Sequence, residues 1–148
     1  MKYKFIGIST DVLSFSLSGA KIAPNKPFEV VPHFDRRILP VENSKLVAVS
    51  IAVKIESTEE KPLPYNISAV LTGLFEPEKE KYTADEERSF VIEATKIVYP
   101  YLNTAVTGLM AQAHVRPIVL PIVEGTVFKE DRPEEKPVYG FTVDNNIN

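Results

Sequence analysis

The sequence predicts an α+β fold in which helices pack on one face of an antiparallel four-stranded sheet. Strand-like segments with period-two alternation fill the first half of the chain, and apolar residues at three- and four-residue spacing follow in the second half. A run of strands followed by helices is typical of layered α+β domains. A chain of 148 residues suits a single domain with one hydrophobic core.

Two strands in the middle of the chain are the clearest. Residues 46–56 place β-branched side chains at every second position: Val47, Val49, Ile51, Val53 and Ile55. Residues 65–75 show the same alternation, with apolar side chains opposite Asn, Ser and Thr. The polar linker STEEKPLP between them is too long for a tight turn. We therefore expect an antiparallel hairpin with an exposed tip.

The N-terminal part of the chain predicts one long strand and a proline-divided connection. In residues 3–17, Leu13, Phe15 and Leu17 form an inward row, which Gly7 and Asp11 interrupt, as expected for a bulge. The path of residues 18–43 is poorly defined by the sequence, because four prolines divide it. Only 28–31 and 34–39 could be short strands there. This region is predicted to be a crossing connection and an edge strand, where proline is tolerated.

Helix is predicted after the charged linker that ends at Tyr82. Thr83 and Glu86 have the spacing of a capping box. Helical periodicity then follows in Phe90, Val91, Ala94, Val98, Leu102, Ala105, Val106, Leu109 and Met110. Because proline disrupts a helix interior, we expect two helices, the second with Pro100 in its first turn.

The sequence predicts a folded domain followed by a C-terminal tail. Residues 1–128 are expected to form the folded domain. Residues 129–148 are a polar, proline-interrupted tail, in which 138–143 is the one candidate for an added strand.

Composition narrows the class of protein. A hydrophobic fraction of 44% with 25% charged residues is ordinary for a globular domain, and the net charge of −3 argues against nucleic-acid binding. The absence of cysteine excludes disulfides and thiolate chemistry, and it suits a reducing compartment. We find no signal-peptide pattern and no apolar run long enough to span a membrane. The expectation is a soluble cytoplasmic domain without membrane insertion.

Residues that could carry chemistry are few. His33 and Asp35, at i and i+2 on a predicted strand, point the same way and could act as an acid–base pair, although a polar edge strand rich in charges is the simpler explanation. His114 suits the C-terminal end of a helix. Neither a metal-ligand spacing nor a glycine-rich phosphate loop occurs. We therefore expect a protein that is not an enzyme, with no catalytic, metal or cofactor-binding residues, and keep catalysis by His33 and Asp35 as an alternative.

Several motifs, in this order, give the chain a family resemblance. Ile97-Val-Tyr-Pro-Tyr101 is similar to the aromatic-Pro-Tyr helix start of SecB, the bacterial protein-export chaperone, and Leu120-Pro-Ile-Val123 to its apolar-Pro-Val segment. Thr72-Gly-Leu-Phe75 and residues 11–15 resemble its strand motifs. The resemblance spans about residues 3–128 and identifies a divergent SecB-like protein. It implies a homotetramer, a dimer of dimers, that binds unfolded or precursor polypeptide in hydrophobic grooves without ATP or cofactor.

The resemblance also assigns residues to these roles. The polypeptide-binding groove would include Phe28, Val30, Phe34, Phe75, Leu120 and Ile122. The oligomer interface would include Tyr99, Leu102, Val106 and Leu109.

Two departures from the family limit what the resemblance implies. The acidic residues with which SecB docks the SecA motor correspond here to Ser16, Asn66 and Ser68, so motor docking is not expected. Arg132-Pro and Lys136-Pro fall where the last helix of the family runs. Two hypotheses stay open. One is a chaperone for unfolded polypeptide, and the other is an interaction module for one dedicated partner, with a groove that the 138–143 strand could fill.

Overall fold

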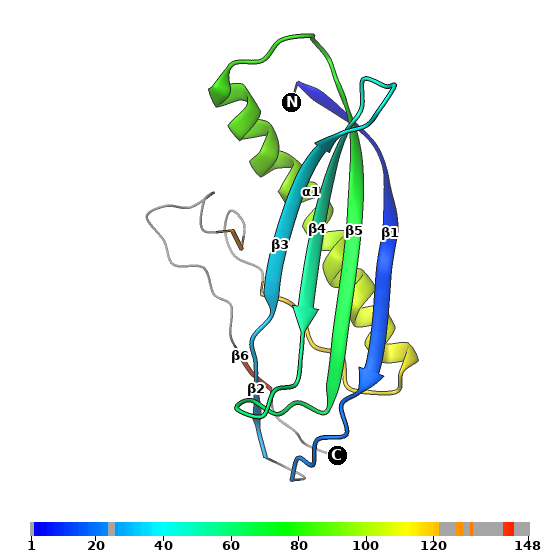
Figure 1. Cartoon of the computed structure of the whole chain (residues 1–148), viewed down its shortest axis with the longest axis vertical. Helices are drawn as coiled ribbons and strands as arrows, with labels where there is room; N and C mark the ends of the chain where they lie inside the picture. The colour runs from blue at the N-terminus through cyan, green and yellow to red at the C-terminus, as the bar shows by residue number, and fades with distance from the viewer. Residues whose placement is uncertain (1, 24–25, 122–126, 129–130, 132–140, 144–148) are drawn as a thin grey trace.

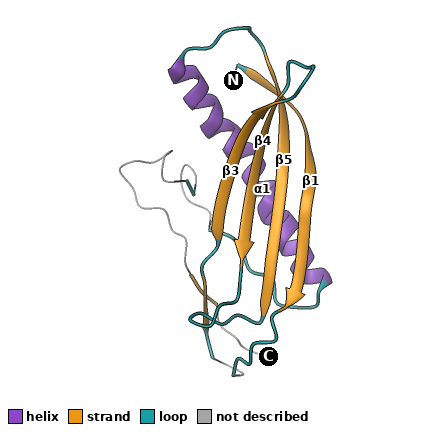
Figure 2. Cartoon of the chain, in the orientation of Figure 1, coloured by secondary structure: helices purple, strands orange, loops and turns teal. Residues whose placement is uncertain are grey.

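A four-stranded antiparallel sheet and one long helix form the two layers of the protein, and the helix passes behind the strands in Figures 1 and 2. The strand order is β1-β5-β4-β3, which leaves β1 and β3 at the edges. The bounds are β1 (Tyr3–Leu17), β2 (Phe28–Val30), β3 (His33–Pro40), β4 (Val47–Ile55), β5 (Tyr65–Pro77), α1 (Ala84–Gln112) and β6 (Phe141–Val143). This computed structural model describes residues 2–23, 26–121, 127–128, 131 and 141–143.

The central strands β4 and β5 pack one row of side chains against the helix. β-branched residues alternate with small or polar ones along β4, so that Val49, Ile51, Val53 and Ile55 are at most 1% exposed. Their neighbours Ile67, Ala69 and Leu71 on β5 are buried on the same face. The predicted α+β class and the antiparallel hairpin are therefore confirmed.

The two edge strands also follow the prediction. The pairing of β1 with β5 shifts register between Phe5 and Gly7 and between Thr10 and Val12, which are the two predicted interruptions. β3 forms the opposite edge and pairs with β4 alone among the described strands. Just before it, β2 pairs antiparallel with β6, so the backbone at 141–143 lies beside the connection that leads into β3.

The expectation of two helices is wrong, because α1 is continuous from Ala84 to Gln112 and contains Pro100. A proline removes one N–H donor and crowds the preceding turn, at a cost of about 3 kcal/mol in a helix interior. Pro100 is exposed, whereas Val98 and Leu102 on either side of it have no exposed surface. Packing of the turns on both sides against the sheet therefore holds the helix together through the proline.

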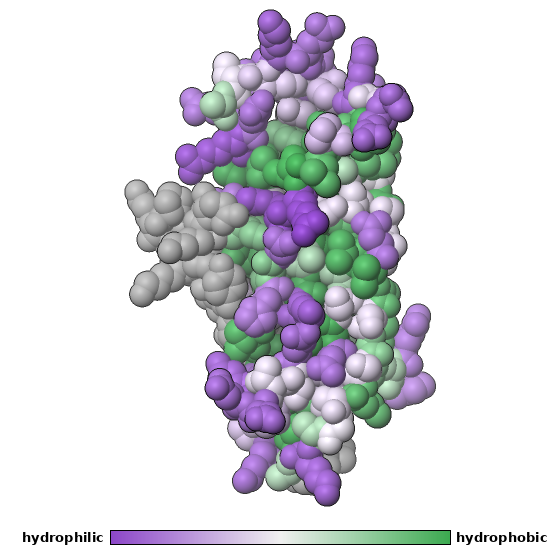
Figure 3. Space-filling view, in the orientation of Figure 1, coloured by the Kyte–Doolittle hydropathy of each residue, from purple (hydrophilic) through white to green (hydrophobic). Residues whose placement is uncertain are grey.

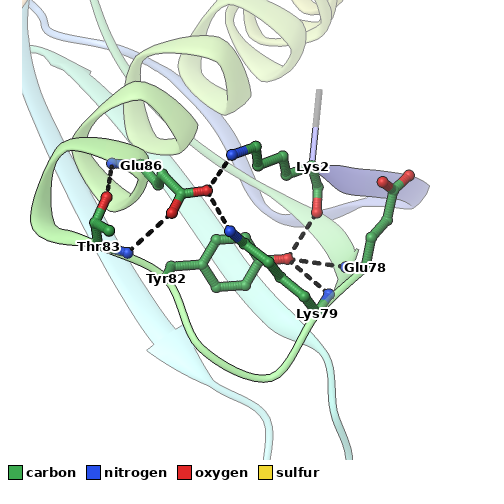
Figure 4. A network of polar contacts seen from close by, with 6 residues as sticks. All are labelled: Lys2, Glu78, Lys79, Tyr82, Thr83 and Glu86. Carbon is green, nitrogen blue, oxygen red and sulfur yellow. Dashed lines mark hydrogen bonds and ion pairs between the residues drawn. The ribbon is translucent and has the colours of Figure 1, made fainter.

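The start of α1 is tied to the first strand by a polar network (Figure 4). Thr83 and Glu86 form the predicted capping box, in which the Thr83 hydroxyl accepts from the Glu86 N–H. The Glu86 carboxylate pairs with Lys2 and, at 2.6 Å, with Lys79. The Tyr82 hydroxyl donates to the Lys2 carbonyl. These contacts fix the N-terminal end of the helix over the start of β1.

Candidate functional site

One side of the protein, along β2 and β3, combines half-buried aromatic side chains with the outer edge of β3, which pairs with no other strand in the described part of the chain. Phe28 on β2 lies edge-on to Tyr65, with ring centroids 6.2 Å apart, and burial raises the pKa of Tyr65 to about 12. Phe28 also lines a pocket of about 470 Å³ together with Ile22, Pro27 and Pro62. Lys and Glu side chains also line that pocket, so its lining combines apolar and charged groups. Further along the same edge, Phe34 and Arg36 of β3 face the helix.

We call the contact between β3 and the helix the β3–α1 seam, and define it by Phe34, Arg36, Thr95 and Tyr99. The rings of Phe34 and Tyr99 lie 5.8 Å apart. The Tyr99 hydroxyl donates to the Pro121 carbonyl, and burial raises the pKa of this phenol. This hydrogen bond holds the segment that follows the helix against Tyr99 of the seam.

Arg36 occupies the middle of the seam and is almost fully buried, with 7% of its side chain exposed. Its two terminal nitrogens donate to the two oxygens of Asp131, at 2.5 and 3.0 Å. It donates a third bond to the Thr95 hydroxyl at 2.9 Å, and its guanidinium lies 4.3 Å from the centre of the Phe128 ring. The seam therefore already holds an aromatic ring and a carboxylate that come from outside the sheet and helix.

The predicted groove residues divide into two groups in the structure. Phe28 and Phe34 are half-buried along the β2–β3 side. Val30, Phe75 and Leu120 have at most 1% of their surface exposed, so they belong to the core of this protomer, and their assignment to the groove stays a prediction. Phe75 packs against Phe5 and Phe90. Ile122 lies outside the described residues.

The predicted interface residues also differ in exposure. Leu102 and Val106 have no exposed surface, because they face the sheet in the protomer's own core. The interface role assigned to these two residues stays a prediction. Tyr99 and Leu109 are half-buried, and their role at an interface stays a prediction.

The opposite edge, β1, exposes large apolar side chains. The exposed fractions are 46% for Ile6, 42% for Val12 and for Leu13, and 74% for Leu17. Leu13, Phe15 and Leu17 lie on the helix side of the sheet as predicted, since they pair with the buried Ala69, Ile67 and Tyr65. Leu13 and Leu17 nevertheless stay exposed, because nothing in the described part of the chain covers them.

No helix or strand in the described part of the chain covers the sheet face turned away from α1, and this face is mixed in polarity (Figure 3). Ser16 and Asn66 face each other across β1 and β5 on this side, and Ser68 lies two positions along. Apolar and polar rows alternate next to them, for example Leu74, Ala48 and Leu39 beside Thr72 and Ser50. The predicted replacements for the motor-docking acids thus lie together on the outer face and carry no charge.

The two histidines lie at exposed positions. His33 and Asp35 share the outer face of β3, but Asp35 pairs with Arg37, at 3.8 Å between Nε and Oδ2. His114 follows the C-cap Ala113 with a left-handed φ of 60°. Within the described ranges, no group of three or more His, Cys, Asp or Glu side chains could hold a metal ion, and no helix is long and apolar enough to cross a membrane.

These features define a protein with the SecB-like fold, in which an antiparallel four-stranded sheet carries a long helix on one face. The structure of Mycobacterium tuberculosis Rv1957, a SecB-like chaperone in complex with a ChAD peptide from the Rv1956 HigA1 antitoxin, aligns with a TM-score of 0.65. The alignment covers 82% of this chain and 91% of that one, at 13% sequence identity. The resemblance read from the sequence is therefore confirmed at the level of the fold.

Other comparisons add less. A protein of unknown function from Streptococcus agalactiae covers the same 82% of this chain at 9% identity, with a TM-score of 0.46. No family model matches the sequence, and no curated protein matches it.

The sequence did not predict the contacts of Arg36 at the centre of the β3–α1 seam. Arg36 lies in an inward row between Phe34 and Ile38, so the one signal was a charge at a position where the alternation predicts an apolar residue. Thr95 and Asp131 gave no signal of their own, because the helix and the acidic tail contain many similar residues.

Proposed function

We propose that this protein is an ATP-independent chaperone that binds unfolded polypeptide along its β2–β3 side. The observation that carries the proposal is the combination there of half-buried aromatic side chains with an edge of β3 that no other described strand occupies. Phe28 and Phe34 offer apolar surface, and Ile38 continues it on the same side of β3 with 38% of its surface exposed. Such a path suits clients that share no sequence, since burial of apolar surface is not directional.

The backbone of β3, which pairs only with β4 among the described strands, provides the second part of the binding mode. An edge strand presents unpaired N–H and C=O groups, to which an extended peptide can add as a further strand. The solved SecB-like chaperone from M. tuberculosis holds a peptide, which supports a polypeptide ligand for a protein of this fold.

Suppression of aggregation tests the proposal. An unfolded reporter protein that aggregates on dilution should stay in solution when this chain is present at a near-stoichiometric ratio. Phe28→Asp should abolish most of the effect, because it replaces an apolar ring in the lining of the pocket by a carboxylate, which disfavours an apolar client. A wild-type chain without effect on aggregation would contradict the proposal.

Ser68→Asp is the matched control for an added charge. Ser68 lies on the outer face, opposite Lys54 in the register, so an aspartate there meets a compatible neighbour. It should leave the suppression of aggregation and the thermal transition unchanged.

We also propose that the protein is not an enzyme and that it acts in the cytoplasm. His33 and Asp35 are given no catalytic role, because Asp35 pairs with Arg37 and both side chains of that pair are more than half exposed. Replacing His33 by Ala should leave every measured property unchanged. Assembly into a homo-oligomer is also proposed, through the β1 edge.

A second candidate function is that of an interaction module for one dedicated protein partner. The observation in its favour is β6, whose backbone pairs with β2 beside Phe28 and so occupies the edge that a client would use. Removal of residues 130–148 should then increase the binding of an apolar dye. General suppression of aggregation by the intact chain would argue against this candidate.

A further inference from the structure

Tyr65 is a buried side chain whose hydroxyl has no hydrogen-bond partner among the residues that the structure describes. It is the first residue of β5, lies on the helix side of the sheet and has only 3% of its surface exposed. The hydroxyls of Tyr82 and Tyr99, in contrast, donate to backbone carbonyls of Lys2 and Pro121. Because a buried hydroxyl without a partner is unfavourable, the unused donor of Tyr65 requires an explanation.

Aromatic rings flank Tyr65 on both sides. The centroid of its ring lies 5.8 Å from that of Phe15 and 6.2 Å from that of Phe28, and both phenylalanines are half-buried. Phe28 also belongs to the lining of the pocket of about 470 Å³ beside β2. One ring therefore connects the surroundings of Tyr65 with an open pocket on the side of the protein to which the client is assigned.

The Tyr65 hydroxyl is a neutral donor under physiological conditions. Burial raises the pKa of this phenol to about 12, so it keeps its proton well above neutral pH. A neutral phenol in apolar surroundings pairs best with a strong acceptor such as a carbonyl oxygen. Every residue of a polypeptide carries a backbone carbonyl. In a folded chain most of these carbonyls are already bonded, whereas in an unfolded segment they lose their water partners on binding and need a new donor.

We propose that the Tyr65 hydroxyl donates a hydrogen bond to a backbone carbonyl of an extended client segment that binds beside Phe28. The inference rests on the proposed function, and it names the polar group with which the site recognises an unfolded backbone. The client places an apolar side chain in the pocket, and the Phe28 ring changes its rotamer to open the path to Tyr65. Such side-chain changes are common when proteins bind their partners. The bond satisfies the client carbonyl and the Tyr65 hydroxyl together, and it requires no particular client sequence.

Tyr65→Phe in the full-length chain tests the inference, because it removes one oxygen atom and keeps the ring. Two quantities are measured: the urea midpoint of unfolding of the free chain, and the Kd for a fluorescently labelled unfolded reporter polypeptide. The midpoint should stay equal or rise, since the variant loses a buried hydroxyl that has no partner. The Kd should increase about tenfold, since the client carbonyl is left without a donor. A lower midpoint, or a Kd equal to that of the wild type, would overturn the inference.

Tyr82→Phe is the matched control. Tyr82 follows the other end of β5, where its hydroxyl donates to the Lys2 carbonyl and accepts from the N–H groups of Glu78 and Lys79. This variant should lower the midpoint of unfolding and leave the Kd for the reporter unchanged. The two variants thus change opposite quantities. An equal loss of reporter binding in both would show that the effect of Tyr65→Phe is not a bond to the client, and the inference would be wrong.

Failure of this inference differs from failure of the proposed function. If the reporter binds the wild-type chain and Tyr65→Phe equally, the inference is wrong and the proposed function stands. If the reporter does not bind the wild-type chain at all, the proposed function fails, and the inference fails with it.

Discussion

Gly73 of β5 lies at a close contact between the sheet and the helix. A Cβ atom at this position would lie 2.6 Å from Cγ2 of Val98 and 3.0 Å from a ring carbon of Phe75. Both neighbours are fully buried, so neither can move aside freely. We predict that Gly73→Ala lowers the free energy of unfolding by about 1–3 kcal/mol, measured by urea denaturation.

Gly7 provides the control for this prediction. A Cβ atom there meets nothing within 4 Å. Gly7→Ala should change the free energy of unfolding by no more than about 0.5 kcal/mol. Equal losses in the two variants would show that the close approach at Gly73 does not limit packing.

Glu86 gives the protein a pH-dependent contribution to stability. Hydrogen bonds from Lys2, Lys79 and the Thr83 N–H lower the pKa of its carboxyl from 4.5 to about 2. Because the pKa is depressed in the folded state, the contribution is complete above about pH 4.5 and is lost as the pH falls toward 2. We predict that Glu86→Gln removes this part of the decline in stability, seen by comparing denaturation curves of both proteins across that range.

Salt provides the check on the Glu86 prediction. The lysines that face Glu86 are well exposed, so about 1 M salt should reduce the difference between wild type and Glu86→Gln. A difference that is independent of both pH and salt would mean that Glu86 acts only as a helix cap.

At the scale of single residues, a contact could be predicted from the sequence only when its two residues are close together in the chain. Thr83 and Glu86 were predictable because a capping box is three residues long and its partners are adjacent. Arg36 and Asp131 were not, because 95 positions separate them and the tail offers several equivalent acids. A charge in an apolar row identifies the first residue of such a pair but not the second.

At the scale of elements, the strands were predictable and the helix only in part. The period-two pattern of β4 and β5 is strict, because one face of each strand is buried along its whole length. Pro100 predicted a break that does not occur, since local propensity is weaker than packing of the surrounding turns. The length of α1 depends on contacts with the sheet, and these contacts could not be predicted from the periodicity of the sequence.

Pro100 should therefore lower the stability of α1. Replacing it by Ala restores a backbone donor on the exposed side of the helix, so Pro100→Ala should raise the free energy of unfolding by roughly 1–3 kcal/mol. Gly108→Ala, also exposed in α1 and with nothing within 4 Å of its Cβ, should add about 0.5–1 kcal/mol. Loss of stability in Pro100→Ala alone would mean that the sheet requires the proline geometry.

At the scale of the whole molecule, the two sheet edges have different properties. β3 is 8 residues long and carries His33, Asp35 and Arg37 on its outer face. Charged side chains on a short edge strand disfavour its pairing with the same strand of another copy. β1 is 15 residues long, exposes Leu13 and Leu17, and has only Lys4 and Asp11 as charged residues. This contrast supports β1 as the edge for a second copy and β3 as the edge for a client.

We predict that the protein is oligomeric and that Leu13→Asp reduces its assembly. A carboxylate on an exposed position of β1 would face its counterpart or be desolvated in the interface, whereas the protomer's own core is untouched. Mass measurement by light scattering should give a multiple of 16.6 kDa for the wild type and a smaller mass for the variant. A wild-type protein that stays monomeric at high concentration would contradict the proposed assembly.

Hydrogen exchange with and without an unfolded polypeptide tests the central claim most directly. If clients bind along the β2–β3 side, amides of 28–30 and 33–40 should exchange more slowly when the polypeptide is present. Amides of β1 should keep the same rates, because that edge is assigned to a second copy. Protection confined to β1 or to the outer sheet face, or no protection at all, would contradict the account.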